Sequence, residues 1–162
     1  MTRLFPEIIM FKRASGVVLP PPLIYLAFML VAWALTEHLP IDLAENAWTR
    51  LGGWGLIVCG VLLMGWAAVL MRRQRTTINP YGKPSQLLDH GPFGFSRNPI
   101  YLADTLIYCG VGLLLASLWP WLLLPLVIAC MHWAVIVHEE HLLGELFGDD
   151  YRAYRQRVRR WL

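Results

Sequence analysis

Charged residues are scarce in this chain of 162 residues: they make up 15% of it, against about 25% of an average soluble domain. Apolar residues make up 57%, where a soluble domain has about 45–50%. This balance excludes an ordinary water-soluble domain, which needs more charge on its surface. The composition therefore predicts an integral membrane protein.

Polar breaks are also missing from four long apolar stretches. Roughly 20 apolar residues span a bilayer as a helix, so we expect an all-α fold with four transmembrane helices in one membrane domain, residues 1–162. The expected spans are residues 17–36, 53–71, 100–118 and 119–137. No polar loop separates the last two, which predicts a tight hairpin. The alternative is that one of the four is buried or re-entrant, and the three prolines at 20–22 make the first span the candidate.

The sequence lacks the motifs of several common kinds of binding site. The three cysteines have no CxxC spacing and the five histidines are scattered, so neither a disulfide framework nor a metal site is predicted. No strand leads into a glycine-rich turn, which argues against a dinucleotide-binding domain. The net charge of +3 has no nucleic-acid-binding motif beside it, so no nucleic-acid partner is expected.

Positive charge is distributed very unevenly along the chain. Thirteen of the fourteen Lys and Arg residues fall before the first span, between the second and third, or after the fourth, and Arg50 is the exception. Because cytoplasmic loops are enriched in Lys and Arg, we expect both termini, the loop 72–98 and the tail 138–162 to be cytoplasmic, with a prokaryotic inner membrane as the host. A cleaved secretory signal is the alternative for the N-terminus, but an uncleaved anchor helix is favoured.

Polar residues gather at the expected cytoplasmic edge of the third span. Arg97, Tyr101, Asp104 and Tyr108 recur at intervals of four, three and four residues, so they share a helix face. A charge at this depth costs about 2.5–3.5 kcal/mol and usually faces a partner or a wet cavity. One hypothesis is a structural pair that only holds helices together, either Arg97 with Asp104 or Asp104 with a tyrosine, and the other is a binding site.

A second polar group follows the fourth span. Glu139 and Glu140 stand at its cytoplasmic end, where acidic residues oppose the helix dipole. They are interpreted either as a solvated helix end or as acceptors for ligand hydroxyls or an ammonium group. Beyond them comes a stripe interpreted as packing, with Gly148 as a break: Leu143, Phe147, Tyr151 and Tyr154.

Two of these segments together carry a family resemblance. "RNPIY" at 97–101, followed about forty residues later by "EEHLLGELFGDDYRAYRQRV" at 139–158, resembles the isoprenylcysteine carboxyl methyltransferase and phospholipid methyltransferase superfamily. The resemblance covers roughly residues 87–160. Asn98 stands where the family usually has histidine, and Ala103 where glycine is common. Asn98 cannot titrate, so an acid–base role at that position is in doubt.

The resemblance implies S-adenosylmethionine as cofactor and a lipidic or isoprenoid-bearing acceptor at the cytoplasmic membrane face. The implied cofactor-binding residues are His90, Gly91, Pro92, Arg97, Asn98, Tyr101, Glu139 and Glu140, with Arg97 and Glu140 also as catalytic residues. An isoprenylcysteine carboxylate needs no base, whereas a phospholipid amine must lose a proton, for which Glu140 or His138 is suited. A non-catalytic membrane scaffold and an NADPH-dependent sterol-reductase-like enzyme are the rival hypotheses.

Overall fold

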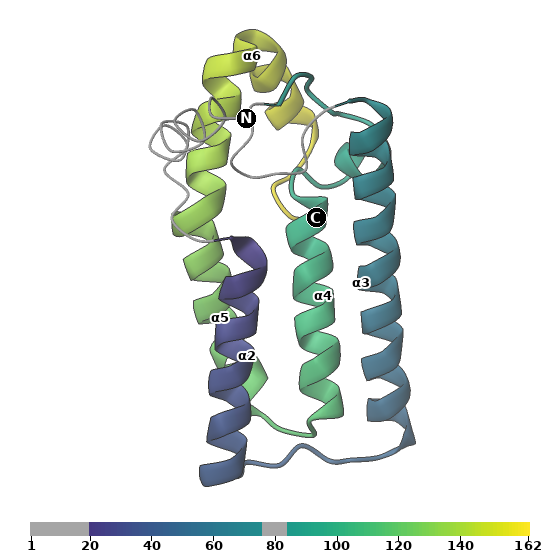
Figure 1. Ribbon diagram of the computed structural model, residues 1–162, viewed down its shortest axis with the longest axis vertical. Coiled ribbons are helices and arrows are strands. Elements are labelled where there is room, and N and C mark those ends of the chain that lie inside the picture. Colours follow the sequence, from purple (N-terminus) through teal and green to yellow (C-terminus); the bar gives the residue numbers. More distant parts are fainter. Residues whose placement is uncertain (1–19, 76–83) are drawn as a thin grey trace, which may run out of the picture.

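The computed structural model describes residues 20–75 and 84–162, and the elements in these ranges are all helical (Figure 1). They are α2 (Pro21–His38), α3 (Ala47–Arg73), the 3₁₀-helix η1 (Gly91–Gly94), α4 (Pro99–Leu114), α5 (Trp119–Met131), the π-helix η2 (His132–Ile136) and α6 (Val137–Arg157). The all-α prediction is confirmed for this part of the chain. Residues 17–19 of the first expected span and residues 76–83 of the expected loop lie outside the described residues.

Within residues 20–75 and 84–162, two helices are long and apolar enough to cross a membrane: α3, and the continuous helical run Trp119–Arg157 formed by α5, η2 and α6. The outer face of α3 is apolar, with large exposed side chains such as Trp54 and Leu62. A soluble monomer rarely exposes so continuous an apolar surface, which fits contact with lipid. That α2 and the shorter apolar helix α4 also cross stays a prediction.

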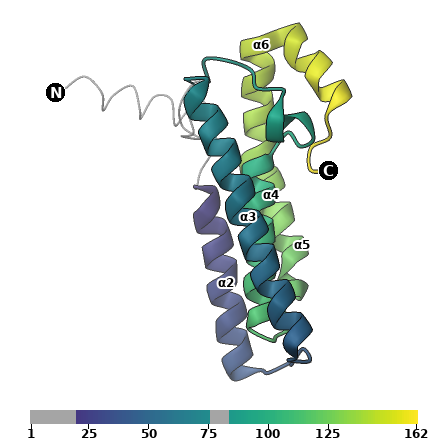
Figure 2. The same ribbon diagram turned by 90° about the vertical axis from the view of Figure 1, so that its right-hand side faces the viewer.

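The helices form an up-and-down bundle in which α3 packs along α4 and α2 packs against α5 (Figures 1 and 2). Between α2 and α4, the Tyr25 hydroxyl bonds the Thr105 hydroxyl (2.8 Å) and donates to the Tyr101 carbonyl (3.2 Å). These two helices share a buried apolar cluster with α5 and η2, around Met131 and Val135. The bundle brings the start of α4 and the end of α6 to one end of the molecule.

Helix boundaries differ from the expected spans for local reasons. The prolines at 20–22 begin α2 instead of interrupting it, because proline fits the first turn of a helix, where its missing N–H has no partner in any case. Helix α3 begins six residues earlier than expected, at Ala47. There the Asn46 side chain accepts the N–H groups of Trp48 and Thr49 at 2.9 and 3.1 Å and the Thr49 hydroxyl accepts the Asn46 N–H at 3.0 Å, which is a capping box.

The expected hairpin between the third and fourth spans is present. Helix α4 ends at Leu114 and α5 begins at Trp119. In the turn, Ser117 is fully buried, and its hydroxyl accepts the Thr36 hydroxyl at 2.7 Å and the Trp119 N–H at 3.3 Å. These bonds tie the hairpin to the end of α2 at the pole opposite the polar residues.

The contact between α3 and α4 depends on glycine. A Cβ atom added to Gly60 would lie 2.7 Å from Ile107 Cγ1 and 2.8 Å from the Ala103 carbonyl oxygen, whereas one added to Gly65 would meet nothing within 4 Å. We therefore expect Gly60→Ala to lower the free energy of unfolding by roughly 1–3 kcal/mol, the usual cost of overpacking. Gly65→Ala is the matched control and should be neutral or slightly stabilising, because alanine favours helix. Thermal unfolding in detergent measures both, and equal melting temperatures would contradict the close packing.

Candidate active site

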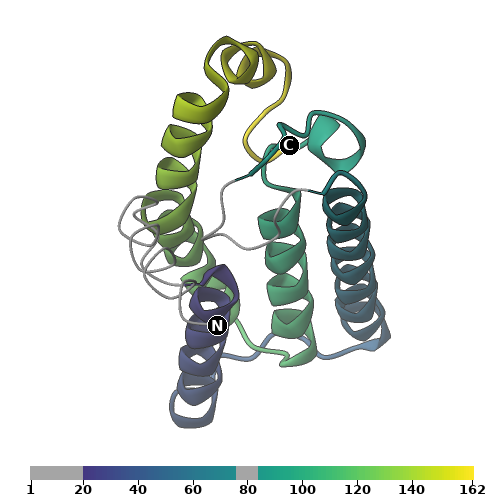
Figure 3. The same ribbon diagram turned by 45° about the horizontal axis from the view of Figure 1, so that its top comes forward.

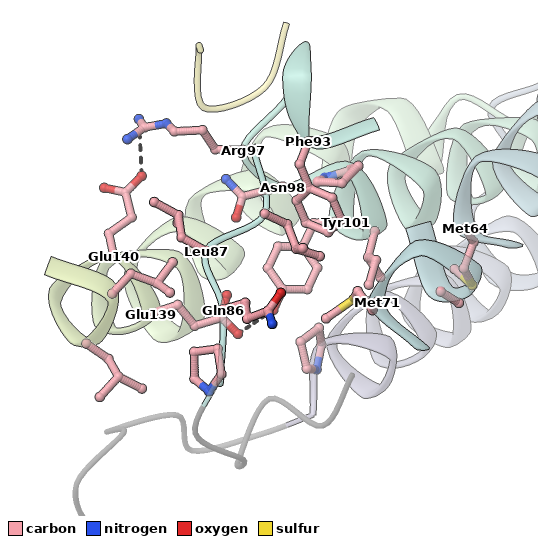
Figure 4. A pocket seen from close by; sticks show the side chains of 18 of the residues that line it. Met64, Met71, Gln86, Leu87, Phe93, Arg97, Asn98, Tyr101, Glu139 and Glu140 are labelled. Atoms are coloured by element: carbon pink, nitrogen blue, oxygen red, sulfur yellow. Dashed lines mark hydrogen bonds and ion pairs between the residues drawn. The ribbon is translucent and has the colours of Figure 1, made fainter. Parts of the chain in front are cut away.

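A cavity of about 730 Å³ lies at the end of the bundle where α4 begins, and residues of α6 also line it (Figure 4). Cavities that bind small molecules commonly measure about 300–1,000 Å³. Its charged and polar lining residues include Arg97, Asn98, Tyr101, Asp104, Glu139 and Glu140. Five of the eight residues expected to bind a cofactor thus line one space, although they come from two polar segments about forty residues apart.

The other three expected residues lie beside this cavity and are not among those that line it. Gly91 has φ +59°, and an added Cβ would lie 3.2 Å from Leu70 Cδ2 on α3, so its glycine is explained by the turn and by packing. Pro92 is fully buried and begins the turn of η1. His90 lies on the exposed side and pairs with Asp89 at 3.6 Å. This segment shapes the loop that presents Arg97.

Arg97 is the central cation of the cavity. Its side chain is only 10% exposed, and its Nη2 lies 3.2 Å from Oε1 of Glu140, as Figure 4 shows. Its Nε and Nη1 are buried without a hydrogen-bond partner among the residues that the structure describes. Buried polar groups are nearly always hydrogen-bonded, so these two donors are an exception that needs an explanation.

The two glutamates have different partners. Glu139 accepts a hydrogen bond from the Tyr101 hydroxyl at 2.6 Å, on the cavity wall. Glu140 accepts Arg160 at both oxygens, at 2.8 and 2.7 Å, in addition to its contact with Arg97. Successive residues of a helix point about 100° apart, so the two neighbouring glutamates reach different partners on the wall of one cavity.

Asp104 lies one helical turn beyond Tyr101 and is not paired with Arg97. The hypothesis of a structural pair between Arg97 and Asp104 is therefore wrong, since Arg97 pairs with Glu140 instead. Asp104 is 9% exposed and lines the cavity, and its Oδ2 is buried without a hydrogen-bond partner within residues 20–75 and 84–162. On the cavity wall, two donors of Arg97 and one oxygen of Asp104 therefore lack hydrogen-bond partners among the described residues.

Aromatic residues after the kink hold the loop and the tail together. Gly148 has φ +49° and ψ −116°, which bends α6. Tyr151, Tyr154 and Val158 then pack in one buried cluster, and the Tyr154 hydroxyl donates to the Phe93 carbonyl at 2.7 Å. The stripe is packing, as predicted, and it positions the loop before α4. Leu87, Leu143 and Phe147 pack against the same cluster.

Two parts of the site were not predicted from the sequence. Met64, Ala68 and Met71 of α3 line the cavity, and Figure 4 shows Met64 and Met71 on the side away from Arg97. The spacing of the three residues, i, i+4 and i+7 on one helix face, was an available signal. No sequence signal pointed to Arg160, because its partner Glu140 is twenty residues away and the chain turns back between them.

The described part of the chain is an all-helical bundle with a cavity of small-molecule size at one pole. The chain belongs to the phospholipid methyltransferase family, whose sequence model matches residues 48–150. This match confirms the family resemblance that the two polar segments carry. The family indicates a membrane methyltransferase.

Two relatives share part of the chain. An uncharacterized protein of Haemophilus influenzae is 40% identical over 63 residues, which are 39% of this chain and the whole of that protein. The nickel-cobalt-cadmium resistance protein NccN of Alcaligenes xylosoxydans xylosoxydans is 35% identical over 71 residues, 43% of this chain but only 33% of NccN. No solved structure matches. Within the described residues, no group of three or more His, Cys, Asp or Glu is arranged to hold a metal ion.

Proposed function

We propose that the protein is an S-adenosylmethionine-dependent methyltransferase acting on a lipidic acceptor at the cytoplasmic face of the membrane. The observation that carries the proposal is the buried Arg97 guanidinium, with Nε and Nη1 unpartnered in the described residues, on the wall of a cavity in a phospholipid methyltransferase family member. A buried guanidinium with donors left over suits an anionic group such as a carboxylate, and the methionine end of S-adenosylmethionine carries one.

The other polar residues complement the rest of such a ligand. Glu139 and Asp104 on the cavity wall offer carboxylate oxygens to an amino group or to ribose hydroxyls. Bound S-adenosylmethionine supplies a methyl group on a sulfonium sulfur, and the sulfur leaves as a neutral thioether when an acceptor lone pair forms the new bond to that methyl carbon. The residues around it have to orient the two reactants and exclude water.

The methionine side of the cavity suits the acceptor. Met64, Ala68 and Met71 line it there, and flexible apolar side chains accommodate hydrocarbon of varied shape. We assign Glu140 to holding Arg97, because both of its oxygens are already hydrogen-bonded to Arg160. The role expected for it as a base is therefore not part of this proposal.

Cofactor binding tests the proposal most directly. The full chain, purified in detergent, is titrated with S-adenosylmethionine and with NADPH in a calorimeter. We then measure the transfer of labelled methyl to a farnesylated cysteine analogue and to phosphatidylethanolamine vesicles. Saturable binding of S-adenosylmethionine with transfer to one acceptor is expected. Binding of NADPH alone would replace the proposal with a reductase, and binding of neither would favour a scaffold.

The proposed orientation makes a separate prediction. We expect Glu45→Cys, in the exposed connection between α2 and α3, to react with a membrane-impermeant maleimide in intact spheroplasts. Asp149→Cys in α6, whose native side chain is 88% exposed, should react only after permeabilisation, because the Lys and Arg residues cluster on that side. The parent chain with its native cysteines is the control. Labelling of Asp149→Cys in intact spheroplasts would reverse the orientation.

A further inference from the structure

The last five residues of the chain turn back onto the segment that carries Arg97 (Figure 3). Helix α6 ends before Val158, which has extended backbone angles and is buried. The Arg97 backbone N–H then donates to the Arg159 carbonyl at 2.9 Å, and the Asn98 side-chain amide donates to the Arg160 carbonyl at 2.9 Å. The C-terminal segment, residues 158–162, is therefore fixed at the rim of the cavity.

Arg160 binds the same carboxylate that Arg97 contacts, that of Glu140. Its Nε and Nη2 donate to the two oxygens of Glu140 at 2.8 and 2.7 Å, and its Nη1 donates to His132 Nδ1 at 3.1 Å. The hydrogen bonds to Glu140 raise the pKa of Arg160 further, so the guanidinium stays charged. This two-point geometry is the strongest form of an arginine–carboxylate contact.

The contact between Arg160 and Glu140 limits how Arg97 can bind the same carboxylate. With both oxygens of Glu140 bound to Arg160, Arg97 has one longer contact to that carboxylate, 3.2 Å, and keeps Nε and Nη1 without partners among the described residues. One carboxylate between two guanidinium groups also leaves a surplus positive charge. Of the two arginines, Arg97 is the one that lines the cavity.

We propose that Arg160 is a positioning residue: by occupying Glu140 it keeps Arg97 available for an anionic group in the cavity. Without Arg160, the Glu140 carboxylate would be free to pair with Arg97 at two points, and the site would neutralise itself. The inference rests on the proposed function only in naming that anion as the carboxylate of S-adenosylmethionine. The Arg97–Glu140–Arg160 arrangement itself does not depend on the cofactor.

Three variants of the full chain separate this role from a structural one. Arg160→Gln should weaken S-adenosylmethionine binding by about tenfold or more, the loss expected for a charge-assisted contact. Arg160→Gln combined with Glu140→Gln should recover most of that affinity, because no carboxylate remains to capture Arg97. Arg159→Gln removes the same charge from an exposed side chain and should bind as wild type. A double variant as weak as Arg160→Gln, or weaker, would overturn the proposal, and so would unchanged binding in Arg160→Gln.

A second measurement distinguishes failure of this inference from failure of the proposed function. Inorganic phosphate should raise the melting temperature of the wild type, should have less effect on Arg160→Gln, and should recover its effect in the double variant. This pattern without S-adenosylmethionine binding would reject the cofactor and keep the role of Arg160. A wild type that responds to neither ligand, or an Arg160→Gln variant that responds to phosphate as wild type does, would reject the positioning role.

Discussion

Replacing Arg97 with methionine is expected to abolish methyl transfer while the melting temperature stays close to that of the wild type. The stability expectation follows from Glu140, which keeps both of its hydrogen bonds to Arg160 when Arg97 is removed. The variant also relieves the cost of burying two donors that have no partner in the described structure. Losing a charge-assisted hydrogen bond to a ligand carboxylate, worth about 1.5–3 kcal/mol, should weaken binding by roughly ten- to a hundredfold.

Arg97→Lys is the sharper variant of the same experiment. Lysine keeps the charge but cannot present two fixed donors in one plane, so we expect melting near the wild type and a strongly reduced affinity for S-adenosylmethionine. Calorimetry and differential scanning in detergent give the two quantities on one sample. If Arg97→Lys binds as wild type, positive charge alone is sufficient there. If Arg97→Met unfolds, its contact with Glu140 is structural after all.

The sequence predicted the helices better than their ends. Apolar length alone identified all four helical segments, because burial in lipid or in a core requires it. The ends depend on single polar contacts: Asn46 extends α3 backwards through its cap, and the fourth apolar run continues through η2 into α6. Composition cannot indicate such continuations, since α6 is mostly polar and is ordered by packing of Tyr151 and Tyr154.

The site was predictable in its members but not in its pairings. Both polar segments were identified, since a charge at a membrane edge needs a reason. The partner of Arg97 was misassigned in one hypothesis because Asp104 is near it in sequence, while Glu140 is near it only after the bundle has formed. The contact between Arg160 and Glu140 was likewise not predictable, because it depends on the kink at Gly148 and on the return of the C-terminal segment.

Asp104 is the residue whose presence is least explained by the stability of the fold. An oxygen of a carboxylate, buried without a partner among residues 20–75 and 84–162, costs stability, about 1–3 kcal/mol for an unsatisfied polar group and more for a charge. Neighbouring groups satisfy themselves without it, since Tyr101 donates to Glu139 and Thr105 bonds Tyr25. Residues that reduce stability in a binding cavity are commonly retained for function.

We therefore expect Asp104→Asn to be more stable than the wild type and less active. The amide has the same shape but no charge to bury, so the melting temperature should rise. Methyl transfer should fall by about tenfold or more, because a ligand donor loses its charged acceptor. Asp149→Asn, at an exposed position of α6, is the control and should change neither quantity. The measurements are thermal unfolding and labelled-methyl transfer, each with the whole chain. A stabilised variant with full activity would mean that no ligand uses Asp104, whereas a destabilised one would mean that the carboxylate has a partner in the folded protein.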